Sequence, residues 1–384
     1  MKKVLFLAYH NSENNNVQST ALVRRISQYE DFFSREGFQI EYIVTKNNDV
    51  QIDDWNHRTL EIPIAKYYKN KILNKLYVFF IMIIWGDIIG YSFYKNRKTI
   101  HTFLEGDYNL IISFFTPRGS IWLGSYLRKK LNTTWWVDLQ DSLSEGLDDI
   151  NLTVGMNWLK KKLAKADQII HVSPEWATED KNHIQKEIVY FRHCIPELPH
   201  ALGNLSSVNN SPAKIIYAGN IHFDAMNPAI LANPLTNFHK LIELEYAGIA
   251  QIAQILSKMN IPLTMLGQLD KKQLHECYSA ADIILILAWN KPGRKVIPSK
   301  FYEACAYNKP ILIVGNDTGA FQSLFEEWGH PNVINDSEDK IEEALSGFIN
   351  NNFERFFCVD KCLFPVSDQT SFDRFLSNSL ISHS

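Results

Sequence analysis

One short segment, residues 294–310, carries the side chains best suited to binding an anion. Pro298 has a fixed φ and no N–H donor, so it suits the first position of a helix, and Asn308 suits the left-handed conformation that ends one. The first turn would offer the N–H groups of Ser299 and Lys300 and the positive end of the helix dipole. Lys300 adds a full positive charge, so the segment predicts an anion site.

Glu303 follows Lys300 by three residues, which places both side chains on one face of the predicted helix. A carboxylate can accept hydrogen bonds from both hydroxyls of a ribose, so the pair suits a nucleotide. An ordinary amphipathic helix with a Lys–Glu surface pair is the alternative interpretation. The context favours the nucleotide, because buried-type strands are expected at 282–287 and 310–315, and α/β sheets bind nucleotides where a helix follows such a strand.

Two parts of this segment match a known pattern: Pro298-Ser299-Lys300-Phe301-Tyr302-Glu303 and, after it, Lys309-Pro310-Ile311-Leu312. They resemble the donor-binding helix of family-four-like retaining glycosyltransferases (glycosyl transferases group 1). The resemblance implies an α/β protein of the GT-B fold, with two doubly wound Rossmann-like domains facing across a cleft. It also implies a C-terminal helix that returns to the N-terminal domain, and metal-independent transfer with retention of configuration. In that family the lysine meets the donor pyrophosphate and the glutamate meets the ribose.

On the donor side, the sequence departs from the family pattern at two places. Relatives with a glutamate eight residues before the position of Glu303 use it on the donor sugar, and Lys295 stands there in this chain. The family often places a basic residue after the first glycine turn of the donor domain, where only His222 is close here. We therefore expect the phosphate charge to be met mainly by Lys300, Arg294 or Lys295.

The donor domain is expected to open with a strand that ends at Gly219 and Asn220. This turn resembles the family's glycine turn, and a glycine lets the backbone approach a phosphate closely. Gly267 ends a later strand, and relatives hold the edge of the base at the corresponding loop. Between the two, we expect a loop insertion at 225–237 and a long helix from Phe238 to Met259.

Length and composition bound the domain organisation. The chain has 384 residues, of which 46% are hydrophobic and 21% charged, which is typical of a globular protein with two domains. A formal net charge of −3 argues against a general nucleic-acid binder. Pro, Gly, Asn and Ser accumulate at 195–213, so we place the linker there. We expect an acceptor-side domain at 1–198, completed by a helix at about 365–384, and a donor-binding domain at 199–364.

The five cysteines include an odd one and form no Cys-x-x-Cys pair, and no His or Cys cluster completes a metal site. We therefore expect a reduced cytosolic protein with neither metal nor cofactor, the nucleotide-sugar being a co-substrate. The apolar run at 4–8 is too short for a signal peptide and suits a first β-strand.

Residues 64–100 combine an apolar run with basic flanks. The run at 76–85 is far shorter than the ~20 residues that a spanning helix needs. A helix lying at an anionic membrane surface and a core helix packed on the sheet both fit this pattern. The flanking cations are Lys66, Lys69, Lys71 and Lys75 before the run, and Lys95, Arg97 and Lys98 after it.

The N-terminal domain contributes four acceptor-side candidates, His10, Asn14, Arg118 and Asp141, and two catalytic candidates, Asp138 and Gln140. The run from Asp138 to Asp141 resembles a family segment beside the donor sugar, although Gln140 replaces a residue that is often charged. With Lys300 and Glu303, Asp138 and Gln140 form the predicted catalytic set. For the two aspartates, helix capping or an internal hydrogen bond is an equal alternative. A solvated loop is the alternative for His10 and Asn14, and a surface position for Arg118.

The leading functional hypothesis is a glycosyltransferase that moves a sugar from a UDP- or GDP-linked donor to a glycan or lipid-linked acceptor. It would act in surface polysaccharide or glycolipid assembly, in the cytoplasm or on the inner face of the membrane. A sugar-nucleotide epimerase of the same fold and a catalytically inactive binding protein are the alternatives. The sequence leaves the base, the sugar, the acceptor and the oligomeric state open.

Overall fold

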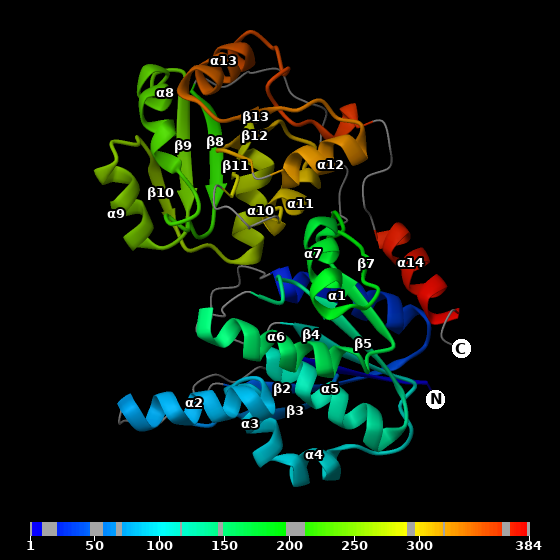
Figure 1. The fold of residues 1–384 in the computed structure, drawn as a ribbon. Helices are drawn as coiled ribbons and strands as arrows, with labels where there is room; N and C mark the ends of the chain where they lie inside the picture. The colour runs from blue at the N-terminus through cyan, green and yellow to red at the C-terminus, as the bar shows by residue number, and fades with distance from the viewer. Residues whose placement is uncertain are drawn as a thin grey trace. The chain divides into compact units, whose positions relative to one another are not determined.

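The computed structural model describes residues 2–9, 21–46, 57–66, 71–115, 117–144, 149–196, 212–289, 296–317, 319–362 and 369–381. The chain forms two compact units, and it passes from the first to the second after Arg192 and returns to the first at Asp373. Each unit holds one wholly parallel sheet (Figure 1). The pairs between the named strands are all parallel, as the buried-type strands in the sequence predict, and within the described residues an isolated antiparallel bridge joins Ile311 to Phe357.

The seven-stranded sheet of the first unit has the order β3-β2-β1-β4-β5-β6-β7. Its order reverses between β1 and β4, which makes it doubly wound. The strands are β1 (Lys3–Tyr9), β2 (Gln39–Lys46), β3 (Arg58–Pro63), β4 (Leu110–Phe115), β5 (Thr134–Leu139), β6 (Gln168–His171) and β7 (Val189–Tyr190). The helices are α1 (Ala21–Arg35), α2 (Lys71–Trp85), α3 (Ile88–Lys95), α4 (Arg97–Phe103), α5 (Arg118–Leu131), α6 (Asp149–Leu163) and α7 (Pro174–Ile184).

The six-stranded sheet of the second unit has the order β10-β9-β8-β11-β12-β13, which reverses between β8 and β11. The strands are β8 (Ala213–Ala218), β9 (Ile242–Ala247), β10 (Thr264–Gly267), β11 (Ile283–Leu287), β12 (Ile311–Val314) and β13 (Ile334–Asn335). The helices are α8 (Ala232–Asn237), α9 (Ala250–Lys258), α10 (Lys271–Ala280), α11 (Ser299–Cys305), α12 (Ala320–Trp328) and α13 (Glu338–Ile349). Two 3₁₀ segments accompany them, η1 (Pro228–Leu231) and η2 (Val359–Lys361).

Both faces of the second sheet are covered by apolar side chains. Along β11, Ile283, Leu285 and Leu287 belong to one buried cluster, whereas Ile284 and Ile286 belong to another. Successive side chains of a strand point to opposite faces, so each face has its own core. A sheet buried on both sides requires nearly continuous apolar strands, which explains why β11 reads Ile-Ile-Leu-Ile-Leu.

The prediction of one long helix from Phe238 to Met259 is wrong. The structure has strand β9, Ile242–Ala247, followed by the shorter helix α9. Residues 242–246 alternate apolar and polar side chains, and the apolar ones are the more buried. This alternation is the period of a half-buried strand. The apolar residues at 249, 252 and 256 follow with helical spacing, so the two patterns together resembled one long helix. The insertion expected at 225–237 contains η1 and α8.

Helix α14 (Gln369–Ile381) confirms that the C-terminal helix returns to the N-terminal domain (Figure 1). Asp373 pairs with Arg35 at the end of α1, and the rings of Phe375 and Phe191 stack with their centroids 5.1 Å apart. The polar pair and the aromatic stack hold the last helix on the first unit.

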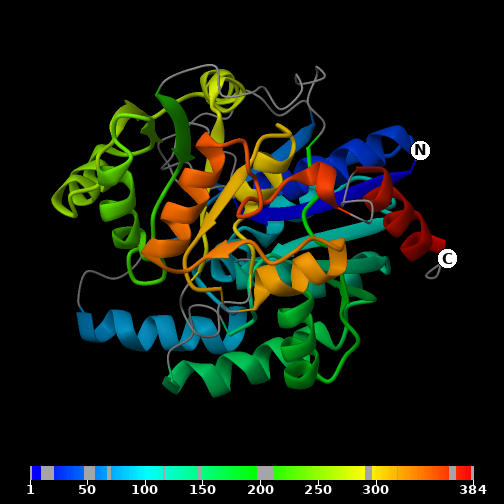
Figure 2. The same ribbon diagram turned by 90° about the horizontal axis from the view of Figure 1, so that it is seen from above.

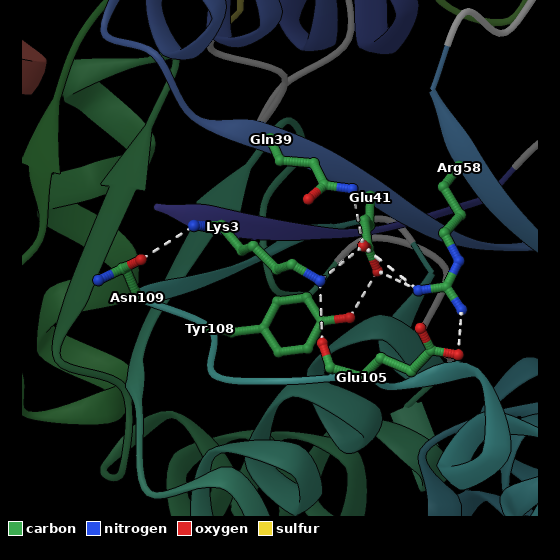
Figure 3. Close-up of polar contacts among 7 residues, drawn as sticks. All are labelled: Lys3, Gln39, Glu41, Arg58, Glu105, Tyr108 and Asn109. Carbon is green, nitrogen blue, oxygen red and sulfur yellow. Dashed lines mark hydrogen bonds and ion pairs between the residues drawn. The ribbon is translucent and has the colours of Figure 1, made fainter. Parts of the chain in front are cut away.

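Glu41 connects the beginnings of several strands at the amino-terminal edge of the first sheet, as Figure 3 shows. Its buried carboxylate accepts a hydrogen bond from Tyr108 at 2.6 Å and pairs with Lys3 at 3.2 Å and Arg58 at 3.3 Å. These partners come from β1, from β3 and from the turn before β4. A buried carboxylate needs such partners, so this network is structural.

Candidate functional site

Helix α11 positions the predicted anion-binding residues. Pro298 is its N-cap, with φ −54° and ψ 129°, and the Phe301 N–H donates to the Pro298 carbonyl at 2.9 Å. The helix ends at Cys305, earlier than expected, because the following turn is tightened by 3₁₀-type hydrogen bonds, in which each N–H donates to the carbonyl three residues before it. Asn308 takes the predicted left-handed conformation, with φ 47°. A helix of seven residues has a weak dipole, so the charge of Lys300 matters more than the sequence suggested.

The two faces of α11 differ in burial. Phe301, Tyr302, Ala304 and Cys305 are buried, and Phe301 packs against the rings of Phe321, Trp328 and Phe357. Ser299, Lys300 and Glu303 are only partly buried. The apolar face fixes the helix on the sheet, so the polar face remains accessible to a ligand.

Lys300 lies beside the turn that follows β8. Its Nζ is 5.2 Å from the centroid of the Tyr217 ring, and the Tyr217 hydroxyl donates to the carbonyl of Asn220 at 2.9 Å. Strands β8 and β11 are parallel neighbours, so the turn after β8 and the helix after β11 meet at the carboxyl edge where the strand order reverses. Such a reversal point is where open α/β sheets bind ligands.

Gly219 occupies this turn with φ 107°, a conformation that side chains disfavour. Its N–H donates to the Ala247 carbonyl at 2.7 Å, and its carbonyl accepts a hydrogen bond from the Tyr246 hydroxyl at 3.2 Å. Both partners belong to β9, so the neighbouring strand holds the turn in place. The structure thus brings Gly219 and Asn220 together with Lys300.

An aromatic pair lies at the same edge, and the sequence analysis identified one of its two residues. The rings of His222 and Trp289 lie with their centroids 5.2 Å apart at an angle of 33°. His222 follows β8 and Trp289 follows β11, so the pair spans the two strands at the reversal point. The sequence singled out His222 as a nearby base, and the position of Trp289 just after a buried strand was the available signal.

Of the three remaining donor-side candidates, Gly267 lies within the described residues. Gly267 ends β10, two strands away from β8, and has φ 80° with open space around its α-carbon. Arg294 and Lys295 lie outside the described residues. Within the described residues, Gly267 is therefore separated from the turn after β8 by strand β9.

Asp138 in the first unit belongs to a closed polar cluster. Its carboxylate accepts hydrogen bonds from Arg25 Nε at 3.0 Å, from the Tyr29 hydroxyl at 2.6 Å and from Gln140 Nε2. Asp138, Arg25 and Tyr29 are fully buried, and burial followed by the charge of Asp138 raises the pKa of Tyr29 well above its usual range. These inward-facing donors favour the interpretation of Asp138 as a residue that makes internal hydrogen bonds. Because Gln140 donates to Asp138, it belongs to the same internal cluster.

Arg118 is the first residue of α5 and faces a capping carboxylate. Asp87 accepts the N–H of Gly90 at 2.9 Å and that of Gly119 at 3.0 Å, so it caps both α3 and α5. Burial lowers the pKa of Arg118, and Asp87 opposes that shift. Asp141 is partly buried after β5, and His10 and Asn14 lie outside the described residues.

No group of three or more His, Cys, Asp or Glu side chains suitable for a metal ion occurs within the described ranges. The five cysteines all lie within the described residues, and none of them forms a disulfide.

No protein-family model matches the chain, and no curated protein matches it by sequence. Solved structures match it along its length. Anabaena Alr3699/HepE in complex with UDP-glucose is 12% identical, with a TM-score of 0.62 over 100% of both chains. The lipopolysaccharide outer core galactosyltransferase WaaB is 13% identical, with a TM-score of 0.56 over 100% of both. A UDP-N-acetylglucosamine 2-epimerase is 11% identical, with a TM-score of 0.55 over 100% of this chain and 96% of that one.

Proposed function

We propose that this chain, which has the GT-B fold, is a glycosyltransferase that uses a UDP- or GDP-linked sugar. The observation that carries the proposal is the cluster at the reversal point of the second sheet, where Lys300 lies beside Tyr217 and the Gly219 turn. A cation next to a glycine turn at this edge suits a diphosphate. The similar HepE structure contains UDP-glucose, which supports a nucleotide-sugar as the ligand class.

In the proposed reaction, the bond between the anomeric carbon and the diphosphate oxygen breaks, and that carbon bonds to an acceptor hydroxyl oxygen. The acceptor proton passes to the leaving diphosphate, and configuration is retained without a metal ion. Lys300 stabilises the charge that develops on the diphosphate. Glu303, one turn further along the partly exposed face of α11, accepts the ribose hydroxyls. The second unit would hold the donor and the first unit the acceptor.

The proposed acceptor is a glycan or a lipid-linked sugar, in surface polysaccharide or glycolipid assembly. The similarity to WaaB, a lipopolysaccharide outer core galactosyltransferase, supports this class. The enzyme would work in the cytoplasm, peripherally on the inner face of the membrane.

A thermal-shift screen against UDP, GDP and ADP tests the proposal, because a ligand that binds only the folded state raises its stability. We expect UDP or GDP to stabilise the protein, and the matching nucleotide-sugar to support transfer or slow hydrolysis. Glu303→Ala should abolish that activity, whereas Glu276→Ala, which alters an exposed glutamate on α10 of the same unit, should not. Stabilisation by no nucleotide would contradict the proposal and favour a binding protein without activity.

An epimerase is the second candidate, because a UDP-N-acetylglucosamine 2-epimerase matches the chain about as well as the transferases do. The distinguishing measurement is incubation with UDP-N-acetylglucosamine alone. Conversion to the epimer in the absence of any acceptor would replace the transferase assignment.

A further inference from the structure

Helix α2 exposes large apolar side chains along most of its length. Leu73 and Leu76 are each 55% exposed and Phe80 is 60% exposed, and Val78, Phe79, Ile83 and Ile84 are exposed as well. Ile81 and Met82 are its buried apolar residues in the described part of the chain. Soluble proteins rarely leave so many large apolar groups together on the surface, so this face indicates a binding partner.

The exposed face is a broad arc. At 100° per residue, six of the seven exposed apolar residues, Phe79, Ile83, Leu76, Phe80, Leu73 and Ile84, cover an arc of about 140°, and Val78 lies outside it. A helix that pairs with one other helix needs only a narrow stripe, so the width suits a flat surface better than a second helix. Figures 1 and 2 both show α2 as a rod whose end extends past the other helices of its own unit.

The charge of the surrounding segment is positive. From Lys71 to Phe103 the sequence contains five Lys or Arg residues and one acid, Asp87. Both carboxylate oxygens of Asp87 accept backbone N–H groups, so that acid is used in capping. Lys75, Lys95 and Lys98 are exposed. This charge complements an anionic surface and would oppose the pairing of two copies of the same segment.

Aromatic side chains anchor the inner side of α2. The Trp85 ring lies 4.9 Å from that of Tyr91 and 5.0 Å from that of Tyr94, and the guanidinium of Arg97 lies 4.4 Å from the Tyr94 ring. Trp and Tyr beside Lys and Arg are typical of positions at the boundary between lipid and water. The packing also fixes α2 on α3, so the exposed face is held by the fold.

Within the described residues, no single helix has the length and apolar character to cross a bilayer. Helices α2 and α3 reach that length only together, and they bend by 71° at the break between them. The geometry of α2 therefore suits a helix that lies in the surface plane.

We propose that the exposed face of α2 docks on an anionic phospholipid surface, with its apolar arc in the headgroup boundary and its cations at the lipid phosphates. The inference deepens the proposed function, on which it rests for the idea of a membrane-linked acceptor. It brings the first unit, which would hold the acceptor, to the surface where a lipid-linked sugar lies.

Co-sedimentation with vesicles tests this assignment, with pure phosphatidylcholine compared with an equimolar mixture containing phosphatidylglycerol. We expect the full-length protein to bind the mixed vesicles and to lose binding at high salt. Phe80→Glu should lower partitioning about tenfold or more, because it removes a large apolar group from the contact. Lys75→Glu should lower it about fivefold. Ile381→Gln, at an aliphatic residue of α14 that is 72% exposed, is the matched control and should bind normally.

Circular dichroism of each variant checks folding, and Leu76→Glu provides a second test of the arc. Equal binding to pure phosphatidylcholine, or binding unaffected by Phe80→Glu and Leu76→Glu, would overturn the assignment. A dimer in light scattering that Phe80→Glu dissolves, without vesicle binding, would assign the face to a second copy instead. Lys300→Ala should keep vesicle binding while losing nucleotide binding, and Phe80→Glu should do the reverse, so the two proposals fail separately.

Discussion

The polar clusters around Asp138 and around Lys300 lie at the carboxyl edges of two parallel sheets, yet they differ in where their donors and acceptors point. In the first unit, Arg25, Tyr29 and Gln140 all direct hydrogen bonds at the carboxylate of Asp138. In the second unit, Lys300 is partly exposed beside a backbone turn. The first cluster is enclosed and its donors to Asp138 point inward, although Gln140 Oε1 is buried with no hydrogen-bond partner among the described residues, whereas the side chain of Lys300 is partly exposed to solvent.

Burial explains the difference. Charges removed from water must be paired with good geometry, and removing one partner leaves the other uncompensated. A partly exposed lysine such as Lys300 has a weaker requirement, since water still solvates part of it and pairs near the surface contribute little. We therefore predict that the Asp138 cluster serves stability and the Lys300 cluster serves binding, and mutations should separate the two.

The largest expected effect is on stability in the first unit. Asp138→Ala leaves Arg25 buried without its carboxylate and should lower the free energy of unfolding by about 3–5 kcal/mol. Urea denaturation measures this loss, with Asp107→Ala as the control at an exposed aspartate of the same unit. If Asp138→Ala were stable and only inactive, the residue would be catalytic and the comparison would break.

Lys300→Ala should act in the opposite manner. Loss of one cation from the developing diphosphate charge should raise the barrier by about 3 kcal/mol, or lower kcat about 10²–10³-fold. The free energy of unfolding should change by less than about 1 kcal/mol, because the side chain is partly exposed. Steady-state kinetics measures the rate, and Lys272→Ala on α10 is the exposed control. A large stability loss with normal kcat would place Lys300 among the structural residues.

Gly219→Ala sharpens the role of the turn. At φ 107° a β-carbon introduces backbone strain, so we expect a loss of about 1–2 kcal/mol in the free energy of unfolding. Because the turn lies beside Lys300, nucleotide affinity should fall as well. Calorimetric titration with the nucleotide found in the screen measures it, and unchanged affinity would remove the turn from the site.

The smallest effect concerns the pH dependence of Asp87. Burial raises the pKa of this carboxyl above its ordinary value of 3.8, against the opposing hydrogen bonds from Gly90 and Gly119. The folded state therefore holds the proton more tightly than the unfolded state, and this group's contribution to stability declines as pH rises from 3.8 through the raised value. Asp87→Asn should remove that decline. Denaturation across this range gives the free energy of unfolding of the wild type minus that of the variant. This quantity should fall as pH rises, and a rise with pH would contradict the prediction.

The local sequence pattern was sufficient to predict those elements whose structure depends on residues close together in the chain. Apolar runs such as 283–287 predicted parallel strands, Pro298 and Asn308 predicted the ends of α11 to within a few residues, and the glycine after β8 predicted its turn. The same reasoning failed at β9, where a strand's alternation merged with the apolar positions of α9. A period of two and a period of 3.6 are hard to separate over so few residues.

The sequence by itself determined two doubly wound parallel sheets and a lysine and a glutamate on one helix face, because each follows from residues close together in the chain. The return of the C-terminal helix was expected only from the family resemblance. Only the tertiary structure decided that Asp138 is enclosed by Arg25, 113 residues away, and that Lys300 meets Tyr217. It also decided that α2 leaves its apolar arc exposed, a choice that composition left open. Burial and partner choice depend on which distant segments the sheets bring together, and no local pattern records that.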